Sequence, residues 1–125
     1  MKKLVIAALF VLAAAGVAAQ EESAIVELWT CNLKEGKTLD EVKATNSKWV
    51  ALMNEKVEDG EITSYVLSNV VGSPETFGYA DIFPNLEVWA KAKRAGQGDD
   101  FSEIDAEFDA LTVCTSNALH RSSQS

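Results

Sequence analysis

The side chains best suited to chemistry in this sequence are carboxylates and aromatic rings that stand two residues apart in strand-like segments. Glu27 precedes Trp29 in one such segment, and Tyr79 precedes Asp81 in another. Because side chains alternate along a strand, each pair lies on one face. A carboxylate buried there needs a partner or has a raised pKa, and we expect Asp81 and the sole histidine, His120, to lie nearest to Glu27. The group is either an acid–base or ligand-binding cluster, or a set of hydrogen bonds at an interface or exposed sheet edge, and the second interpretation is favoured.

A predicted helix provides a second set of candidates. Asn46 interrupts the apolar stripe of this helix, and a buried amide must be hydrogen-bonded. We expect either a pocket between helix and sheet, with Trp49 as an aromatic wall, or a local bond from Asn46 to nearby backbone. Trp29 could line the same pocket, and Tyr65 or Tyr79 could donate a hydrogen bond to a carbonyl group of a ligand. Core packing and an interface rim are the alternatives for these aromatic residues.

The sequence lacks the spaced motifs of metal and nucleophile sites. Cys31 and Cys114 do not form a Cys-x-x-Cys pair, and with one histidine they provide too few ligands for zinc. No Gly-x-Ser-x-Gly, P-loop or His-Glu-x-x-His pattern occurs. We therefore expect no metal and no cofactor, and we interpret the acidic run between residues 99 and 109 as a solvated helix face.

The first residues have the pattern of a cleaved secretory signal peptide. Two lysines follow Met1, an apolar run covers residues 4–12, and small residues lead up to Ala19. We expect cleavage before Gln20 and a periplasmic or secreted mature protein without a membrane anchor. In an oxidising compartment two cysteines usually pair, so a Cys31–Cys114 disulfide is predicted.

Length and charge limit the possible partners. The chain has 125 residues and a formal net charge of −8 at pH 7. This charge argues against nucleic acid and anionic membrane surfaces, because both require clustered basic residues. The length fits one domain, which we place at residues 20–120, followed by a polar tail at residues 121–125.

The elements that must position these residues follow the order β-α-β-β-α-β. Strands are predicted over residues 24–33, 62–71, 76–83 and 113–120. A helix begins at Thr38, which has capping-box spacing with Glu41, and it runs to about Val57. Asn85 caps a second helical region that residues 96–100 divide into two pieces. This is the ferredoxin-like order, an α+β fold with one antiparallel sheet and helices on one face.

One segment resembles a known group of proteins. A strand ending in Asp81-Ile82-Phe83 is followed by a helix that starts Pro84-Asn85-Leu86-Glu87-Val88-Trp89-Ala90. This resembles the strand-to-helix corner of dimeric α/β-barrel proteins, which include antibiotic-biosynthesis-monooxygenase-like and NIPSNAP-like proteins. The resemblance covers essentially the whole mature chain in element order, and it implies a homodimer.

The ferredoxin-like strand order 4-1-3-2 makes the first and last strands antiparallel neighbours. Pairing Cys31 with Cys114 then predicts the register of these two strands, with three further pairs: Trp29 opposite Ser116, Glu27 opposite Ala118 and Ile25 opposite His120.

The two faces of the predicted sheet differ in character. We expect the helices to cover the more apolar or smaller residues, namely Val26, Leu28, Gly78, Ala80 and Ile82. The other face is too apolar for water and too polar for an ordinary core, so a second subunit would cover it. Its residues are Ile25, Glu27, Trp29, Cys31, Tyr79, Asp81 and Phe83.

Three functions are compatible with these observations. The first is an exported small-molecule-binding homodimer that takes a small apolar or aromatic ligand. The second, implied by the resemblance, is a cofactor-independent monooxygenase-like enzyme acting on a small aromatic substrate. The third is a structural or interaction protein. A pocket of about 300 Å³ or more that contains Asn46, Trp49 and a tyrosine would favour binding or catalysis over the third function.

Overall fold

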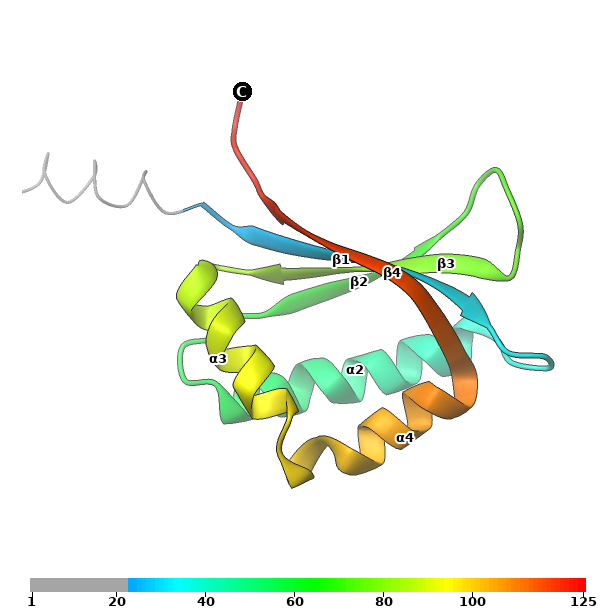
Figure 1. Cartoon of the computed structure of the whole chain (residues 1–125), viewed down its shortest axis with the longest axis horizontal. Helices are drawn as coiled ribbons and strands as arrows, with labels where there is room; N and C mark the ends of the chain where they lie inside the picture. The colour runs from blue at the N-terminus through cyan, green and yellow to red at the C-terminus, as the bar shows by residue number, and fades with distance from the viewer. Residues whose placement is uncertain (1–22) are drawn as a thin grey trace, which may run out of the picture.

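The computed structural model describes residues 23–125, so the predicted signal peptide lies outside the described part of the chain. Its elements are β1 (Ile25–Leu33), α2 (Leu39–Lys56), β2 (Thr63–Ser68), β3 (Thr76–Phe83), α3 (Leu86–Gly96), the 3₁₀ turn η1 (Asp99–Phe101), α4 (Ser102–Leu111) and β4 (Thr112–Arg121). This order confirms the predicted β-α-β-β-α-β arrangement (Figure 1). Within residues 23–125 no helix is both long and apolar enough to span a membrane.

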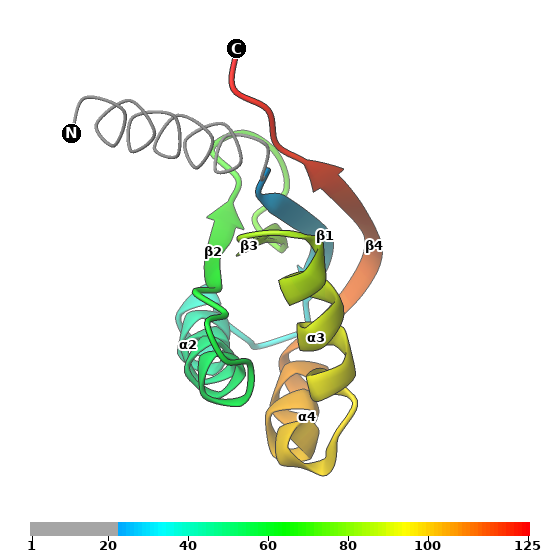
Figure 2. The ribbon, with the colours of Figure 1, turned by 90° about the vertical axis from the view of Figure 1, so that its left-hand side faces the viewer.

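The four strands form one antiparallel sheet in the order β2-β3-β1-β4. This is the predicted ferredoxin-like strand order. The sheet curves over the helices, with α2 beneath one side and α3 and α4 beneath the other (Figure 2). We call the face toward the helices the inner face and the opposite one the outer face.

Local hydrogen bonds set the ends of α2. The Thr38 hydroxyl accepts from the Glu41 N–H at 3.3 Å, and the Glu41 carboxylate accepts from the Thr38 N–H at 2.9 Å. This is the predicted capping box. At the other end, the Asn54 side chain bonds both the N–H and the carbonyl of Ile62, at 2.8 and 2.9 Å. These bonds connect the last turns of α2 to the start of β2.

The second helical region begins at Asn85, whose side chain accepts from the Val88 N–H at 2.9 Å. The chain turns at Gly98 into η1 and then into α4, as the glycine-rich break predicted. Val88 and Ala92 of α3 and Ile104 of α4 are buried. The two short helices therefore pack their apolar sides against the rest of the domain.

The predicted assignment of the sheet faces is wrong. Glu27 and Asp81 are 3% and 6% exposed, and Phe83 is fully buried, whereas Leu28 is 38% exposed. The helices thus cover the mixed face, and the face predicted to be covered, with Val26, Leu28, Gly78, Ala80 and Ile82, is the outer one. The physical reason is that the inner face carries large aromatic rings for the core, while its carboxylates find donors on other elements.

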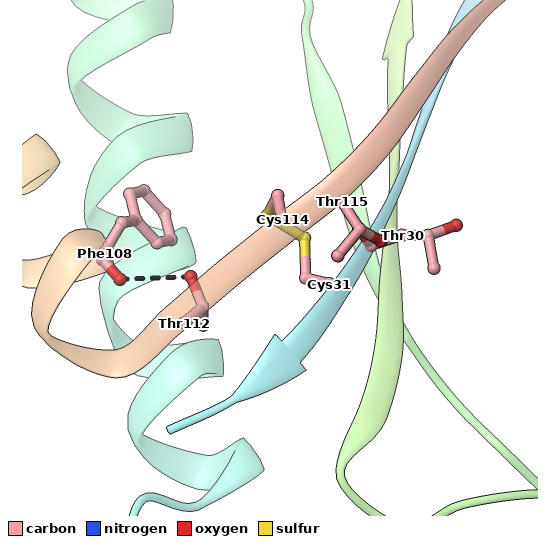
Figure 3. The surroundings of a disulfide bond; sticks show 6 residues. All are labelled: Thr30, Cys31, Phe108, Thr112, Cys114 and Thr115. Carbon is pink, nitrogen blue, oxygen red and sulfur yellow. Dashed lines mark hydrogen bonds between the residues drawn. A yellow bond between two sulfur atoms is a disulfide. The ribbon is translucent and has the colours of Figure 1, made fainter. Parts of the chain in front are cut away.

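The Cys31–Cys114 disulfide connects β1 and β4, as predicted (Figure 3). The register beyond it differs from the prediction. Thr30 pairs with Ser116 rather than Thr115, so β4 contains a one-residue β-bulge at this point. The Thr115 hydroxyl donates to the carbonyl oxygen of Thr30 at 3.3 Å.

The bulge changes every later pair of β1 and β4. Trp29 lies opposite Asn117, Glu27 opposite Leu119 and Ile25 opposite Arg121, each one residue further than predicted. Because a one-residue slip turns side chains to the other face, His120 pairs with Val26 on the outer face.

Candidate functional site

A cavity of about 430 Å³ lies on the inner side of the sheet. Residues from β1, α2, β3, α3, α4 and β4 line it: Trp29, Asn46, Trp49, Tyr79, Asp81, Lys93, Asp105, Phe108, Asp109, Thr112 and Cys114. The lining combines aromatic rings, carboxylates and hydrogen-bond donors.

Asp81 ends a short chain of hydrogen bonds that begins on α2. The Asn46 amide donates to the Ser64 hydroxyl at 2.9 Å, and Ser64 donates to the Asp81 carboxylate at 2.5 Å. Burial raises the pKa of Asp81 to about 6, and the negative charge of Glu27 acts in the same direction. The Ser64 hydrogen bond and the Lys93 charge partly offset this rise in pKa. Asp81 is therefore a buried carboxyl group that titrates close to neutral pH.

Glu27 lies on the next strand, and one cation and two neutral donors bind its carboxylate. Its carboxylate forms an ion pair with the Lys93 ammonium at 2.5 Å. It also accepts from the Asn117 amide at 2.7 Å and from the Trp89 indole N–H at 3.2 Å. The Lys93 ammonium lies 5.5 Å from the centre of the Trp29 ring, at cation–π distance. Glu27 thus holds Lys93 at the cavity wall.

Tyr79 is 7% exposed, and its hydroxyl has no hydrogen-bond partner among residues 23–125. Its ring packs edge-on against Phe77 and Phe108, with centroids 5.2 and 5.8 Å away. The Thr112 hydroxyl donates to the Phe108 carbonyl at 3.0 Å (Figure 3). Burial, and secondarily the charge of Asp81, raise the pKa of Tyr79, and the nearby Thr112 hydroxyl offsets a smaller part of this rise, so the Tyr79 hydroxyl stays protonated. A buried hydroxyl without a partner is costly, so the Tyr79 hydroxyl is a candidate hydrogen-bond donor for a group that enters the cavity.

The acidic run of residues 99–109 is solvated as predicted, with five of its six acidic side chains exposed. Asp105 and Asp109 line the cavity, although both side chains are exposed. Burial, followed by the charge of Asp109, raises the pKa of Asp105. On another side of α4, Glu107 binds the Lys48 ammonium at 3.0 Å.

The structure brings five of the eight predicted site residues to the cavity: Trp29, Asn46, Trp49, Tyr79 and Asp81. Glu27 lies behind the wall and contacts the cavity through Lys93. Tyr65 and His120 lie on the outer face, as their pairing with Ala80 and Val26 shows, so the expected contact of His120 with Glu27 is wrong.

Sequence reasoning missed several residues of the site: Ser64, Lys93, Asp105, Phe108, Asp109 and Thr112. A signal existed for Lys93, which stands four residues after Trp89 and therefore on the same side of its helix. Within residues 23–125 no group of three or more His, Cys, Asp or Glu side chains is arranged to hold a metal ion. The cavity offers hydrogen-bonding groups, charged groups, aromatic surface and the carboxyl group of Asp81, whose pKa is about 6.

No protein-family model and no curated protein sequence matches this chain. Solved structures do match it in fold. SnoaB, a cofactor-independent oxygenase from Streptomyces nogalater, superposes with a TM-score of 0.63 at 10% identity, over 82% of this chain and 96% of SnoaB. A NIPSNAP family protein of unknown function from Agrobacterium tumefaciens superposes with a TM-score of 0.62 at 15% identity, over 83% of this chain and 92% of its own.

These likenesses bear out the resemblance inferred from the strand-to-helix corner. The chain has the ferredoxin-like α+β fold that occurs in antibiotic-biosynthesis-monooxygenase-like and NIPSNAP-like proteins. At this level of identity the similarity concerns the fold, so the function has to be argued from the cavity itself.

Proposed function

We propose that this protein is an exported small-molecule-binding protein whose ligand occupies the cavity beneath the sheet. The observation that carries the proposal is the unpartnered hydroxyl of Tyr79, buried at a cavity of about 430 Å³. Ligand pockets commonly have volumes of about 300–1,000 Å³, with mostly apolar walls and a few placed polar groups. Trp29, Trp49 and Phe108 provide the apolar walls here.

The first test is native mass spectrometry of the mature protein purified from its exported form, with a denaturing run beside it. We expect an additional mass of a few hundred daltons that is lost on denaturation. A variant series makes the result specific to the cavity. Asn46→Leu removes a polar wall residue and should abolish the additional mass, whereas Ser47→Leu changes an exposed neighbour on α2 and should retain it. If Asn46→Leu only increases stability and leaves ligand content unchanged, the proposal is wrong.

A second candidate is a cofactor-independent oxygenase acting on an electron-rich aromatic substrate. The specific observation in its favour is Asp81, a carboxyl group at the cavity with a pKa of about 6. Such a group can accept a proton from an acidic phenol or enol, and the resulting anion is more easily oxidised by O₂. Oxygen uptake with 1-naphthol and 1,5-dihydroxynaphthalene tests this activity. The uptake should be lost in Asp81→Asn, and absence of uptake in the wild-type protein would contradict the candidate.

We also propose that the protein forms a homodimer through the outer face of the sheet. The mixed face, which the sequence predicted to be the dimer interface, is covered by the protein's own helices. The outer face instead exposes Leu28, Tyr65 and Leu67, at 38%, 58% and 45%. Exposed apolar patches of this kind are typical of association surfaces. Light scattering should give twice the chain mass for the wild type and a monomer for Leu67→Glu, and a monomeric wild type would refute the proposal.

A further inference from the structure

The charges around the cavity do not balance. Three carboxylates line it, those of Asp81, Asp105 and Asp109, and Lys93 is the one basic residue among the lining residues within the described chain. The Lys93 ammonium is already paired with Glu27 at 2.5 Å. Because Glu27 and Lys93 are together neutral, Lys93 offsets the charge of Asp81 only in part and forms no ion pair with any of the three aspartates. The cavity therefore has an excess of negative charge.

The two aspartates of α4 have no basic partner of their own. Asp105 and Asp109 are four residues apart, so they lie on one side of the helix, where like charges repel. Neither carboxylate takes part in an ion pair within residues 23–125. The Lys34 ammonium contacts the backbone carbonyl of Asp109 rather than its side chain. Glu107, which points to another side of the same helix, is paired with Lys48.

Aromatic rings accompany these carboxylates. Trp29, Trp49 and Phe108 line the cavity beside the three aspartates. Aromatic faces attract organic cations through their quadrupole, and sites for ammonium ligands combine such faces with carboxylates. The unpartnered Tyr79 hydroxyl, 7% exposed, offers a hydrogen bond to a polar atom of the same ligand. This hydroxyl is an observation independent of the charges, and it also indicates a ligand.

We infer that the cavity binds a small organic cation with an aromatic or apolar body, such as an aryl-alkyl amine, whose ammonium group offsets part of the negative charge of Asp81, Asp105 and Asp109. This inference rests on the proposed function, in which the cavity binds a small molecule. The rings accept the body of the ligand, and Tyr79 bonds a polar substituent. The formal net charge of −8 adds a long-range attraction for cations.

The test uses three probes that share one ring system and differ in charge: 2-(1-naphthyl)ethylamine, 2-(1-naphthyl)ethanol and 1-naphthylacetate. Binding of each to the mature, disulfide-bonded protein is measured by isothermal titration calorimetry at pH 7.5 and low salt. We expect the amine to bind about tenfold more tightly than the alcohol, because the exposed carboxylates of Asp105 and Asp109 and the aromatic faces each add a modest attraction for the ammonium group. We expect the acetate to bind most weakly.

Two matched double variants assign the preference to the cavity. Asp105→Asn/Asp109→Asn should reduce the ratio of amine to alcohol affinity to about two or less. Asp99→Asn/Glu103→Gln removes the same charge from neighbouring exposed residues that do not line the cavity, and should leave the ratio unchanged. Circular dichroism checks that both variants are folded.

The outcomes separate the two proposals. If the alcohol or the acetate binds as tightly as the amine, the cation inference is wrong and the binding function stands. If both double variants reduce the ratio equally, the preference comes from the overall charge and the inference is also wrong. If none of the three probes binds, the cation inference is wrong, and the small-molecule function is decided separately by the additional mass in native mass spectrometry.

Discussion

Replacing Asp81 with asparagine should stabilise the protein at neutral pH. The carboxylate is 6% exposed, and burial raises its pKa to about 6 from an ordinary value of 3.8. The folded state therefore binds the proton more tightly than the unfolded state does, and stability falls as the pH rises from about 4 to about 6. Above this window the wild-type protein keeps a buried charge, whereas the asparagine variant is neutral and can still accept the hydrogen bond from Ser64.

The size of the effect follows from the difference in pKa. A difference of about two pKa units corresponds to about 3 kcal/mol at pH 7.5, where the carboxyl is ionised in both states. At pH 4 the carboxyl is protonated in the folded state and half protonated in the unfolded state, so the advantage of the variant shrinks below about 1 kcal/mol. The groups that face Asp81, namely Lys93, Glu27, Ser64, Trp29 and Tyr79, are the same in both proteins.

The assay is urea unfolding of both proteins at pH 4, 5, 6 and 7.5, followed by tryptophan fluorescence with the disulfide intact. Glu55→Gln, which removes one exposed charge from the same acidic chain, is the control and should show no comparable gain. The reasoning is refuted if Asp81→Asn is less stable than the wild type at pH 7.5. A gain that does not change with pH would refute it equally, because it would not come from the proton.

Two further changes test the contacts around the site. Lys93→Met leaves the buried Glu27 carboxylate without its cation and should lower the free energy of unfolding, measured with urea, by about 3–5 kcal/mol. The control Lys91→Met, on the exposed side of α3, should change this free energy by less than about 1 kcal/mol. Replacing Cys31 and Cys114 with serine opens a loop whose ends are 83 residues apart and should cost about 4.5 kcal/mol in the chain-entropy description; a urea midpoint unchanged from the oxidised wild type would contradict this value.

The arrangement of the fold could be predicted because its signals are local. The capping box at Thr38 and the cap at Asn85 place the helix starts, and the glycine-rich break before Phe101 divides the second helical region. The spacing of Cys31 and Cys114 fits the strand order in which the first and last strands are neighbours. Each of these features depends on residues within a few positions, or on one covalent link.

The choice of the inner face could not be made correctly from the alternation pattern. Polarity favoured Val26 and Leu28 over Glu27 as buried residues, because a lone carboxylate is costly in a core. The donors that remove this cost, Lys93 and Asn117, come from α3 and from a strand 90 residues away. No pattern within β1 contains this information. The same holds for Tyr79, whose missing partner can be recognised only when its surroundings are known.

The bulge in β4 allows this strand to lose one residue without a change in its pairing with β1. Thr115 is the residue that β4 carries in excess of β1, between the Cys31–Cys114 pair and the Thr30–Ser116 pair. Removing it would restore plain alternation and leave every other pair in place, including Asn117 opposite Trp29. Removing a residue between Asn117 and Arg121 while the bulge is kept would turn the remainder of the strand over. Deleting Thr115 thus preserves every other pair of the two strands, and we expect the protein lacking Thr115 to fold with its disulfide and its cavity unchanged.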